Sequence, residues 1–346
     1  MKKRIPPAAL QQPTAPVQVP QVTQPQATPA PASVPPIPPA PAAGAGKPTP
    51  PTQQDLYTAM FESLDPSGTD EKHKRRDEVF KQYLSSTVEA HAVSKTYNVL
   101  LIHDESTMIR GDADRVYAAA SSFTDRKPLL LVLYSTGGSI GSAYLIGKLC
   151  REYAKEKFVV VVPRQAKSAA TLICCAADEI HMGSLSELGP IDPQIDELPA
   201  LGLKHSVEHL ADLVKQNPAA SEMFARYLHY SLKPVHLGYY ERVAQSAAQY
   251  AERLLSLHPG TLPKSAGKIA ADLVYTYKDH GFVIDRAEAE IIFGPQVVKT
   301  RTPEYDFGNS VYRVLSSVAE FAGWLNHGFY MIGNTDSKPM FWKRRT

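Results

Sequence analysis

The sequence predicts an α/β fold with a parallel sheet, and three observations support this prediction. The β-runs at residues 97–103, 129–135 and 158–163 are almost continuously apolar, as strands covered on both faces are. Helical patterns separate these runs at a spacing that suits right-handed βαβ crossovers. Small residues follow the second run at Gly137-Gly138 and the third at Ser168-Ala169-Ala170. Because the carboxyl ends of parallel strands meet at one edge of a sheet, these two turns should lie together.

Residues 1–52 form a segment of a different kind. The first 51 residues hold 16 of the 29 prolines and no acidic residue. Such a stretch has too little apolar side chain to offset the entropy of ordering. We therefore expect a disordered or polyproline-type arm, which is a candidate for binding a further partner that the sequence does not identify.

The body begins with helical patterns at residues 53–64 and 70–93, within an N-terminal segment that spans 53–96. The second helix is highly charged and should pack across the sheet edge or on a neighbouring subunit. Further helices are expected over residues 112–122, 139–156, 265–277 and 285–293. Residues 199–258 change to a helical pattern with breaks at Asn217-Pro218 and Lys233-Pro234, and residues 301–346 hold aromatic-rich fragments whose place in the fold is not predicted.

Ser168 stands where a nucleophile would be useful. Backbone N–H groups exposed at a helix N-terminus bind anions, and a hydroxyl at the same turn can attack a carbonyl. Gly137 and Gly138 allow positive φ and the close approach of a substrate. This pattern indicates acyl-transfer chemistry. Ser168 does not stand in a Gly-x-Ser-x-Gly motif, so the nucleophile elbow of the α/β-hydrolases does not apply to it.

Two segments carry a family resemblance. STGGSIGSAYLI (135–146) resembles the oxyanion-loop segment of ClpP-type and signal-peptide-peptidase-type serine proteases, and AKSAATLICCAADEIHMGSLSELGPIDPQ (166–194) resembles their nucleophile segment. On these runs the chain is identified as a member of the serine dehydrogenase proteinase (SDH) family, a branch of the ClpP/crotonase superfamily. The resemblance implies stacked ββα-type units over residues 97–300, a helical insertion at 199–258, a C-terminal extension at 301–346, and a serine endopeptidase that forms a homo-oligomer and cleaves a protein or peptide substrate.

The resemblance also implies the catalytic residues. Ser168 needs a base, because a free hydroxyl is a poor nucleophile at neutral pH. ClpP-type enzymes carry a histidine about twenty-five residues further on, but this chain has Pro190-Ile191-Asp192 there. The family order Ser, Asp, His instead implies Asp192 as orienter and His280 as base. The expected oxyanion donors are the N–H groups of Gly138 or Ser139 and of Ala169.

Other interpretations remain open. Asp178 is a rival for Asp192, but ten residues of continuous helix would separate it from Ser168 by about 15 Å. The base could be a lysine, with Lys204 the best-spaced, as in signal-peptide-peptidase-like relatives. Crotonase-like folds also hold acyl thioesters with paired N–H donors, so a catalytically degenerate binding or scaffold protein is a third hypothesis.

Composition excludes several classes. The arm is basic and the body is close to neutral, which argues against nucleic acid as the main partner. Cys150, Cys174 and Cys175 have no metal-ligand spacing and should be buried reduced thiols, which favours a cytoplasmic protein without metal or cofactor. No run approaches the length of a membrane span, and Pro-Pro follows the basic start where a signal peptide needs an apolar run.

Overall fold

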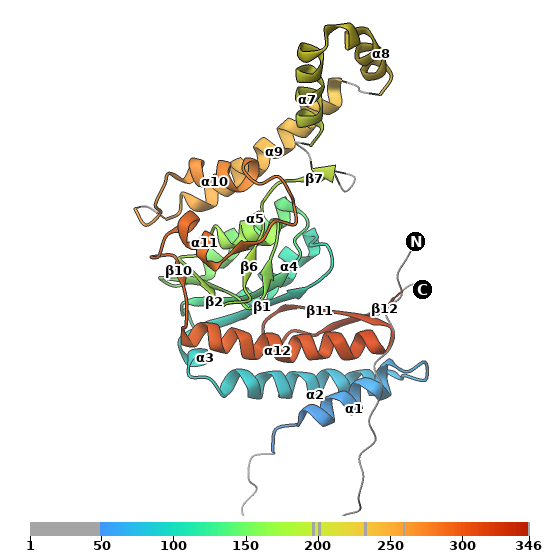
Figure 1. Cartoon of the computed structure of the whole chain (residues 1–346). Coiled ribbons are helices and arrows are strands. Elements are labelled where there is room, and N and C mark those ends of the chain that lie inside the picture. Colours follow the sequence, from blue (N-terminus) through green and yellow to red (C-terminus); the bar gives the residue numbers. More distant parts are fainter. Residues whose placement is uncertain (1–48, 196–197, 200–201, 232–233, 259, 345–346) are drawn as a thin grey trace, which may run out of the picture. The chain divides into compact units, whose positions relative to one another are not determined.

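The structure is a computed structural model that describes residues 49–344 except 196–197, 200–201, 232–233 and 259. The chain divides into two units, Met1–Pro48 and Thr49–Thr346. The first unit lies outside the described residues, and with it nearly all of the arm expected over residues 1–52. The second unit is shown in Figure 1.

A mostly parallel sheet forms the centre of this unit, in the order β10-β5-β3-β2-β1-β11-β12. Its strands are, in that order, Val298–Lys299, Glu179–Met182, Phe158–Val162, Leu129–Ser135, Asn98–Asp104, His327–Gly333 and Met340–Lys343. The pairs from β10 to β1 are parallel, while β11 runs antiparallel to β1 and β12 antiparallel to β11. The predicted α/β fold with a parallel sheet is confirmed. The three predicted strands correspond to β1, β2 and β3, with bounds within one residue.

A second layer of short strands begins at the carboxyl end of β2. Ser135 of β2 pairs with Ala166 of β4 (Gln165–Ala166). β4 then pairs with β6 (Glu187–Leu188), and β6 pairs with β9 (Ile284–Asp285). This short ladder brings together three segments that are far apart in the sequence: the turn after β4, the loop after β6 and the loop before β9.

One face of the sheet is covered by α4, α5, α6, α9 and α10 (Figure 1). These helices span Arg110–Ser121, Ile140–Tyr153, Ala169–Cys174, Pro234–Leu255 and Ala266–Tyr275. Alternate strand residues such as Leu131 and Val160 point into this core, where Cys150, Cys174 and Cys175 are also buried. The cysteines are free thiols, as predicted, and burial raises the pKa of each.

The other face is covered by α1 (Gln53–Leu64), α2 (Asp70–Glu89) and α12 (Pro303–Trp324). Phe80 and Leu84 of α2 are fully buried in the same cluster as Leu101 and Val132 of the sheet. The apolar side of the charged helix therefore packs within its own chain, where Phe80 lies 6.1 Å from Phe329 of β11 and Arg76 lies over Phe341 of the edge strand β12. Of the two expected locations, this agrees with the sheet edge and not with a neighbouring subunit. This helix gives no argument for an oligomer.

The helical segment after residue 199 contains α7 (Gly202–Gln216), a 3-10 turn (Pro218–Ala220), α8 (Ser221–Ser231) and α9. A short antiparallel pair, β7 (Gln194–Ile195) with β8 (Leu198–Pro199), precedes it. Helix starts at Pro218 and Pro234 agree with the breaks expected from the sequence. α9 differs from a simple insertion, because Ala247, Ala251 and Leu254 in its second half are part of the main core.

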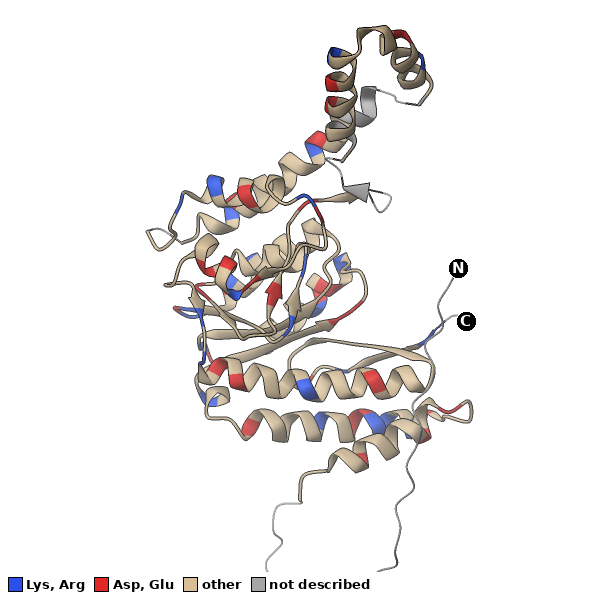
Figure 2. Cartoon of the chain, viewed as in Figure 1, with Lys and Arg blue, Asp and Glu red and all other residues tan. Residues whose placement is uncertain are grey.

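Two short helices complete the description: α3 (Val93–Thr96) before β1, and α11 (Arg286–Phe293) between β9 and β10. On the face shown in Figure 2, Lys and Arg are interspersed with Asp and Glu. Within the described residues, no helix combines the length and the apolar character that crossing a membrane requires.

His103, near the end of β1, is a buried histidine without a polar partner. Its ring lies 4.7 Å from the ring of Tyr134 and 5.8 Å from those of Tyr312 and Phe329, measured between centroids. Within the described part of the chain neither ring nitrogen has a hydrogen-bond partner. Burial lowers the pKa of His103 to about 3.

The free energy of unfolding should therefore decrease as the pH is lowered, because of this one side chain. The unfolded chain takes up a proton at His103 below about pH 6.5, while the native chain does not until about pH 3. The contribution is complete above pH 6.5 and decreases by about 1.4 kcal/mol per pH unit below it. His103→Phe should remove about 2 kcal/mol of the stability difference between pH 7 and pH 5, measured by urea unfolding. An equal pH dependence in both proteins would contradict this.

Candidate active site

Ser168 lies at a strained turn between β4 and α6. It is the N-cap of α6, with φ 52° and ψ −119°, a conformation that L-residues with a Cβ adopt at a cost of about 1–3 kcal/mol. Its neighbours Ala169 and Ala170 are fully buried, whereas Ser168 is half-buried. The hydroxyl of Ser168 is therefore accessible at a turn whose next two residues are buried.

The Gly137-Gly138 turn lies directly against Ser168. A Cβ added to Gly137 would lie 2.8 Å from the Cβ of Ser168 and 3.1 Å from the nitrogen of Ala169. One added to Gly138 would lie 2.3 Å from the nitrogen of Met108. Both glycines have positive φ, 103° and 140°. The two turns predicted to lie together do so, and only glycine fits between them.

Two backbone N–H groups at this junction are unpaired. Within the described residues, the N–H groups of Gly138 and Ala169 donate to no acceptor. Ser139 differs, since its N–H donates to the carbonyl oxygen of Met108 at 2.9 Å. Of the two alternatives expected beside Ala169, Gly138 is therefore available as an oxyanion donor and Ser139 is occupied.

The loop after β6 passes over the nucleophile turn. A Cβ on Gly189 would lie 3.4 Å from the nitrogen of Ser168. The Thr171 hydroxyl lies 2.6 Å from the carbonyl oxygen of Ala166 and accepts a hydrogen bond from the N–H of Gly189 at 3.1 Å. Further along the loop, Ile191 donates its N–H to the carbonyl oxygen of Leu273 at 2.9 Å. These bonds fix the loop that carries Asp192.

Asp192 and His280 meet although 88 residues separate them. Nδ1 of His280 lies 2.7 Å from Oδ1 of Asp192. The Asp192 side chain is only 8% exposed, while that of His280 is 31% exposed. Gln194 donates to the other carboxylate oxygen at 3.1 Å. A carboxylate bound to Nδ1 leaves Nε2 of the ring free to take up a proton, which is the arrangement of a catalytic Asp–His pair.

The structure does not join this pair to Ser168 by a hydrogen bond. In the described part of the chain, the hydroxyl of Ser168 has no hydrogen-bond partner. The loops that carry the two groups nevertheless adjoin at Gly189. Catalytic hydrogen bonds are often long in unliganded sites and shorten when substrate binds.

The rival residues have structural partners elsewhere. Asp178 accepts a hydrogen bond from the N–H of Phe158 at 2.7 Å and pairs with Arg151, at the start of β3. α6 ends at Cys174, so the continuous helix assumed in the distance estimate does not exist, but Asp178 still lies at the opposite end of the strand from the Ser168 turn. His181, 2% exposed, is bound to Thr302 and Glu179 at 2.6 and 3.0 Å.

Lys204 lies in the first turn of α7. Its side chain is outside the described part of the structure.

Lys167 is the residue of this site that sequence reasoning did not find. Its Nζ lies 3.2 Å from the carbonyl oxygen of Leu188, 3.3 Å from that of Phe282 and 3.2 Å from the carboxylate of Glu187. The only signal in the sequence is its position next to Ser168, which does not indicate where the side chain points.

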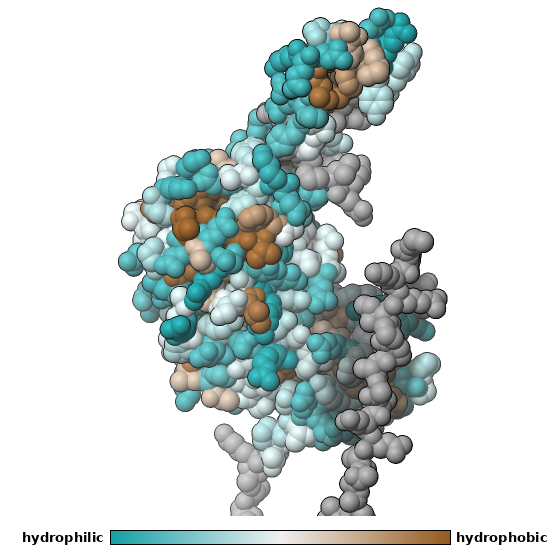
Figure 3. All heavy atoms as spheres, viewed as in Figure 1, coloured by the Kyte–Doolittle hydropathy of each residue, from teal (hydrophilic) through white to brown (hydrophobic). Residues whose placement is uncertain are grey.

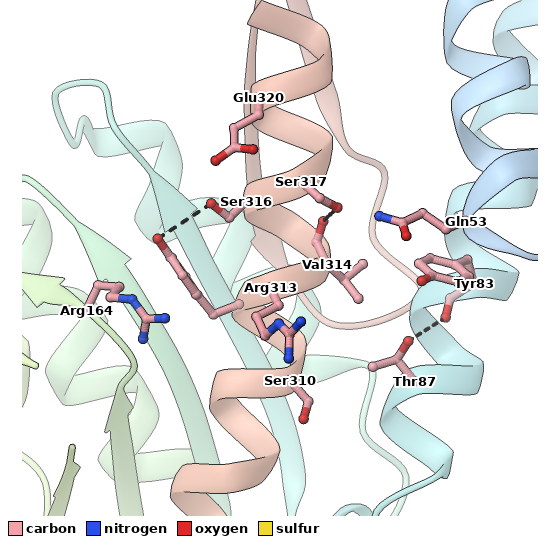
Figure 4. Close-up of a pocket in the computed structure, with 11 residues that line it drawn as sticks. Gln53, Tyr83, Thr87, Arg164, Ser310, Arg313, Val314, Ser316, Ser317 and Glu320 are labelled. Carbon is pink, nitrogen blue, oxygen red and sulfur yellow. Dashed lines mark hydrogen bonds between the residues drawn. The ribbon is translucent and has the colours of Figure 1, made fainter. Parts of the chain in front are cut away.

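A cavity of about 560 Å³ lies on the other face of the sheet, between α1, α2 and α12 (Figure 4). Arg164 reaches it from the end of β3, with its guanidinium 4.8 Å from the ring centre of Tyr312. None of Ser168, Asp192 and His280 lines this cavity. It is separate from the candidate active site.

One family model matches part of the chain. Residues 100–217 match the model of the ClpP-like SDH-type serine proteinases. Uncharacterized protein MJ0137 of Methanocaldococcus jannaschii is 35% identical over 97 residues, which are 28% of this chain and 34% of the relative. Uncharacterized protein MJ1495 of the same organism is 33% identical over 92 residues, 27% of this chain and 31% of the relative. The chain thus spans about a third of the length of these relatives.

Two solved structures are similar at low identity. A serine-to-alanine variant of the 1510-N membrane-bound stomatin-specific protease has a TM-score of 0.37 and 12% identity, covering 65% of this chain and 86% of that one. A lysine-to-alanine variant of the same protease in complex with a substrate peptide has a TM-score of 0.36 and 12% identity, covering 59% of this chain and 76% of that one.

Proposed function

We propose that this chain, whose residues 100–217 match the model of the ClpP-like SDH-type serine proteinases, is a serine endopeptidase. Ser168 is the nucleophile, His280 the general base, Asp192 its orienter, and the N–H groups of Gly138 and Ala169 form the oxyanion hole. The observation that carries this assignment is the 2.7 Å contact between His280 and Asp192 beside the turn that holds Ser168.

The proposed reaction uses these groups in turn. Nε2 of His280 takes the hydroxyl proton while Oγ of Ser168 attacks the peptide carbonyl, whose oxygen becomes an oxyanion. The N–H groups of Gly138 and Ala169 stabilise that charge, each contributing about 3 kcal/mol. The imidazolium then gives its proton to the leaving amine, and the acyl group remains on Ser168. A water molecule activated by the same imidazole releases the acid and restores the hydroxyl.

Two alternatives remain from the sequence. In the first, the base is Lys204 and the pair of Asp192 and His280 has a structural role. In the second, Gly138 and Ala169 hold an acyl group without hydrolysis. Both are separable from the triad by experiment, because they assign different consequences to the loss of His280 and of Ser168.

Labelling with a fluorophosphonate probe tests the proposed function. Such probes form a covalent bond with an activated serine, so the wild-type chain should be labelled and Ser168→Ala should not. Ser139→Ala is the matched control, because Ser139 lies at the neighbouring turn and caps α5 through its side chain. It should be labelled like the wild type. Labelling that survives Ser168→Ala, or an unlabelled wild type, would refute the assignment of Ser168.

A further inference from the structure

We propose that Lys167 is a positioning residue that fixes the loop of His280 against the nucleophile turn. The inference rests on the proposed function for its catalytic consequence. Its structural part stands on the contacts of one side chain, which joins three segments of the site: the turn of Ser168, the strand β6 that leads to Asp192, and the loop of His280.

Lys167 has the contacts that such a role requires. Its side chain is 14% exposed and its ammonium group has three acceptors within 3.3 Å: the carbonyl oxygens of Leu188 and Phe282 and the carboxylate of Glu187. An ammonium group has three N–H donors, so each has an acceptor. With these three contacts made, the group has no donor left for Ser168.

The loop of His280 has few other bonds to the nucleophile turn. His280 bonds to Asp192, and β9 pairs with β6 just after the loop. The backbone N–H groups of Gly281 and Phe282 bond locally, each to Asp279 at 3.1 Å. Phe282 and Val283 are 41% and 50% exposed, so the loop is not buried in the core. The bond from Lys167 to Phe282, two residues after His280, ties the loop directly to the nucleophile turn.

The consequence is a loss of catalytic geometry without loss of the catalytic groups. Lys167→Met keeps the aliphatic stem and removes the ammonium group. A displacement of about 1 Å at a reacting group costs roughly 10²-fold in rate, so kcat should fall by about that factor while KM changes little. Lys167→Arg keeps the charge and the donors but cannot act as a base, and it should retain most of the activity.

Hydrogen exchange and kinetics together test this proposal. Amide exchange over residues 278–283 should be faster in Lys167→Met than in the wild type, whatever the activity of the protein. Lys155→Met is the control, since the Lys155 side chain is 55% exposed and, among the described residues, its ammonium group pairs only with Glu156, at 3.8 Å. Glu187→Gln removes the charge partner and leaves Lys167 in place. It should have an intermediate effect, and it serves as the test if Lys167→Met does not fold.

The outcomes are distinct. Unchanged exchange over residues 278–283 in both Lys167→Met and Glu187→Gln would overturn the proposal. So would a Lys167→Arg variant as inactive as Ser168→Ala, because Lys167 would then be a base and not a positioning residue. A wild type that no fluorophosphonate labels, with faster loop exchange in Lys167→Met, would refute the proposed function and leave the structural role of Lys167 supported.

Discussion

Ser168→Ala should lower kcat by about 10⁶-fold, the loss typical of removing the nucleophile from a serine triad. The fold should not change, because Ser168 is half-buried and its hydroxyl has no hydrogen-bond partner among the described residues. Alanine keeps the Cβ, so it keeps the strained backbone as well. Peptidase assays and thermal unfolding on the same preparation measure both effects.

Ser168→Gly is the matched variant for the strain. Glycine adopts φ 52° and ψ −119° without the clash of a Cβ, so it should release about 1–3 kcal/mol. The greater entropy of glycine in the unfolded chain offsets about 0.5–1 kcal/mol of this. The glycine variant should be as inactive as the alanine variant and more stable by about 1 kcal/mol in urea unfolding. Equal stability of the two variants would contradict the claim of strain, and activity in either would contradict the claim of a nucleophile.

The elements of the sheet and its first covering helices were predictable from local pattern. The strands at Leu129–Ser135 and Phe158–Val162 are apolar throughout because helices cover both faces, and such runs are readable without a neighbour. The helix at Gln53–Leu64 was predicted with its observed bounds, and in the structure Thr52 and Asp55 form a capping box at its start.

The C-terminal part of the unit was not predictable in the same way. β11 pairs antiparallel with β1, from which more than two hundred residues separate it, and α12 covers the face opposite to α5. In the sequence, residues 301–346 show only aromatic-rich fragments. Which of these fragments are strands becomes clear only from the pairing of β11 with β1 and of β12 with β11. The packing of α2 was left between two locations for the same reason. Its apolar stripe at Phe80 and Leu84 is visible in the sequence, but only α12 and the sheet show what the stripe packs against.

Some residues of the candidate site were predictable from local sequence, and others were not. Ser168 and the glycines at 137 and 138 stand at turns whose chemistry is local. The pairing of Asp192 with His280 depends on tertiary structure, and it was expected only from the resemblance to a family. The occupied N–H of Ser139 and the contacts of Lys167 depend on single hydrogen bonds, to Met108 and Phe282, that no local pattern encodes. Catalytic roles for these residues stay a proposal until they are tested.

His280→Ala should lower kcat nearly as much as Ser168→Ala, and the double variant should be no worse than either single variant. Triad members act as a unit, so removing the base leaves a hydroxyl that cannot attack, and removing the hydroxyl leaves a base without a substrate proton. Asp192→Asn should cost about 10⁴-fold, because the amide can stabilise the wrong tautomer of His280. Its oxygen and nitrogen keep the shape of the carboxylate, which makes it a sharper change than alanine.

The variants Ser168→Ala, His280→Ala and Asp192→Asn, together with Lys204→Met, show whether His280 or Lys204 is the base. If Lys204 is the base, Lys204→Met loses the activity while His280→Ala and Asp192→Asn keep most of it. If His280 is the base, the order is reversed and the losses of Ser168→Ala and His280→Ala do not add in the double variant. If the losses of Ser168→Ala and His280→Ala add in the double variant, the two residues contribute independently. That result would contradict the triad, because residues that transfer the same proton act as a unit. We expect the non-additive loss. The carboxylate of Asp192 is 8% exposed and lies 2.7 Å from the imidazole of His280, and it pairs with no lysine in the described part of the chain.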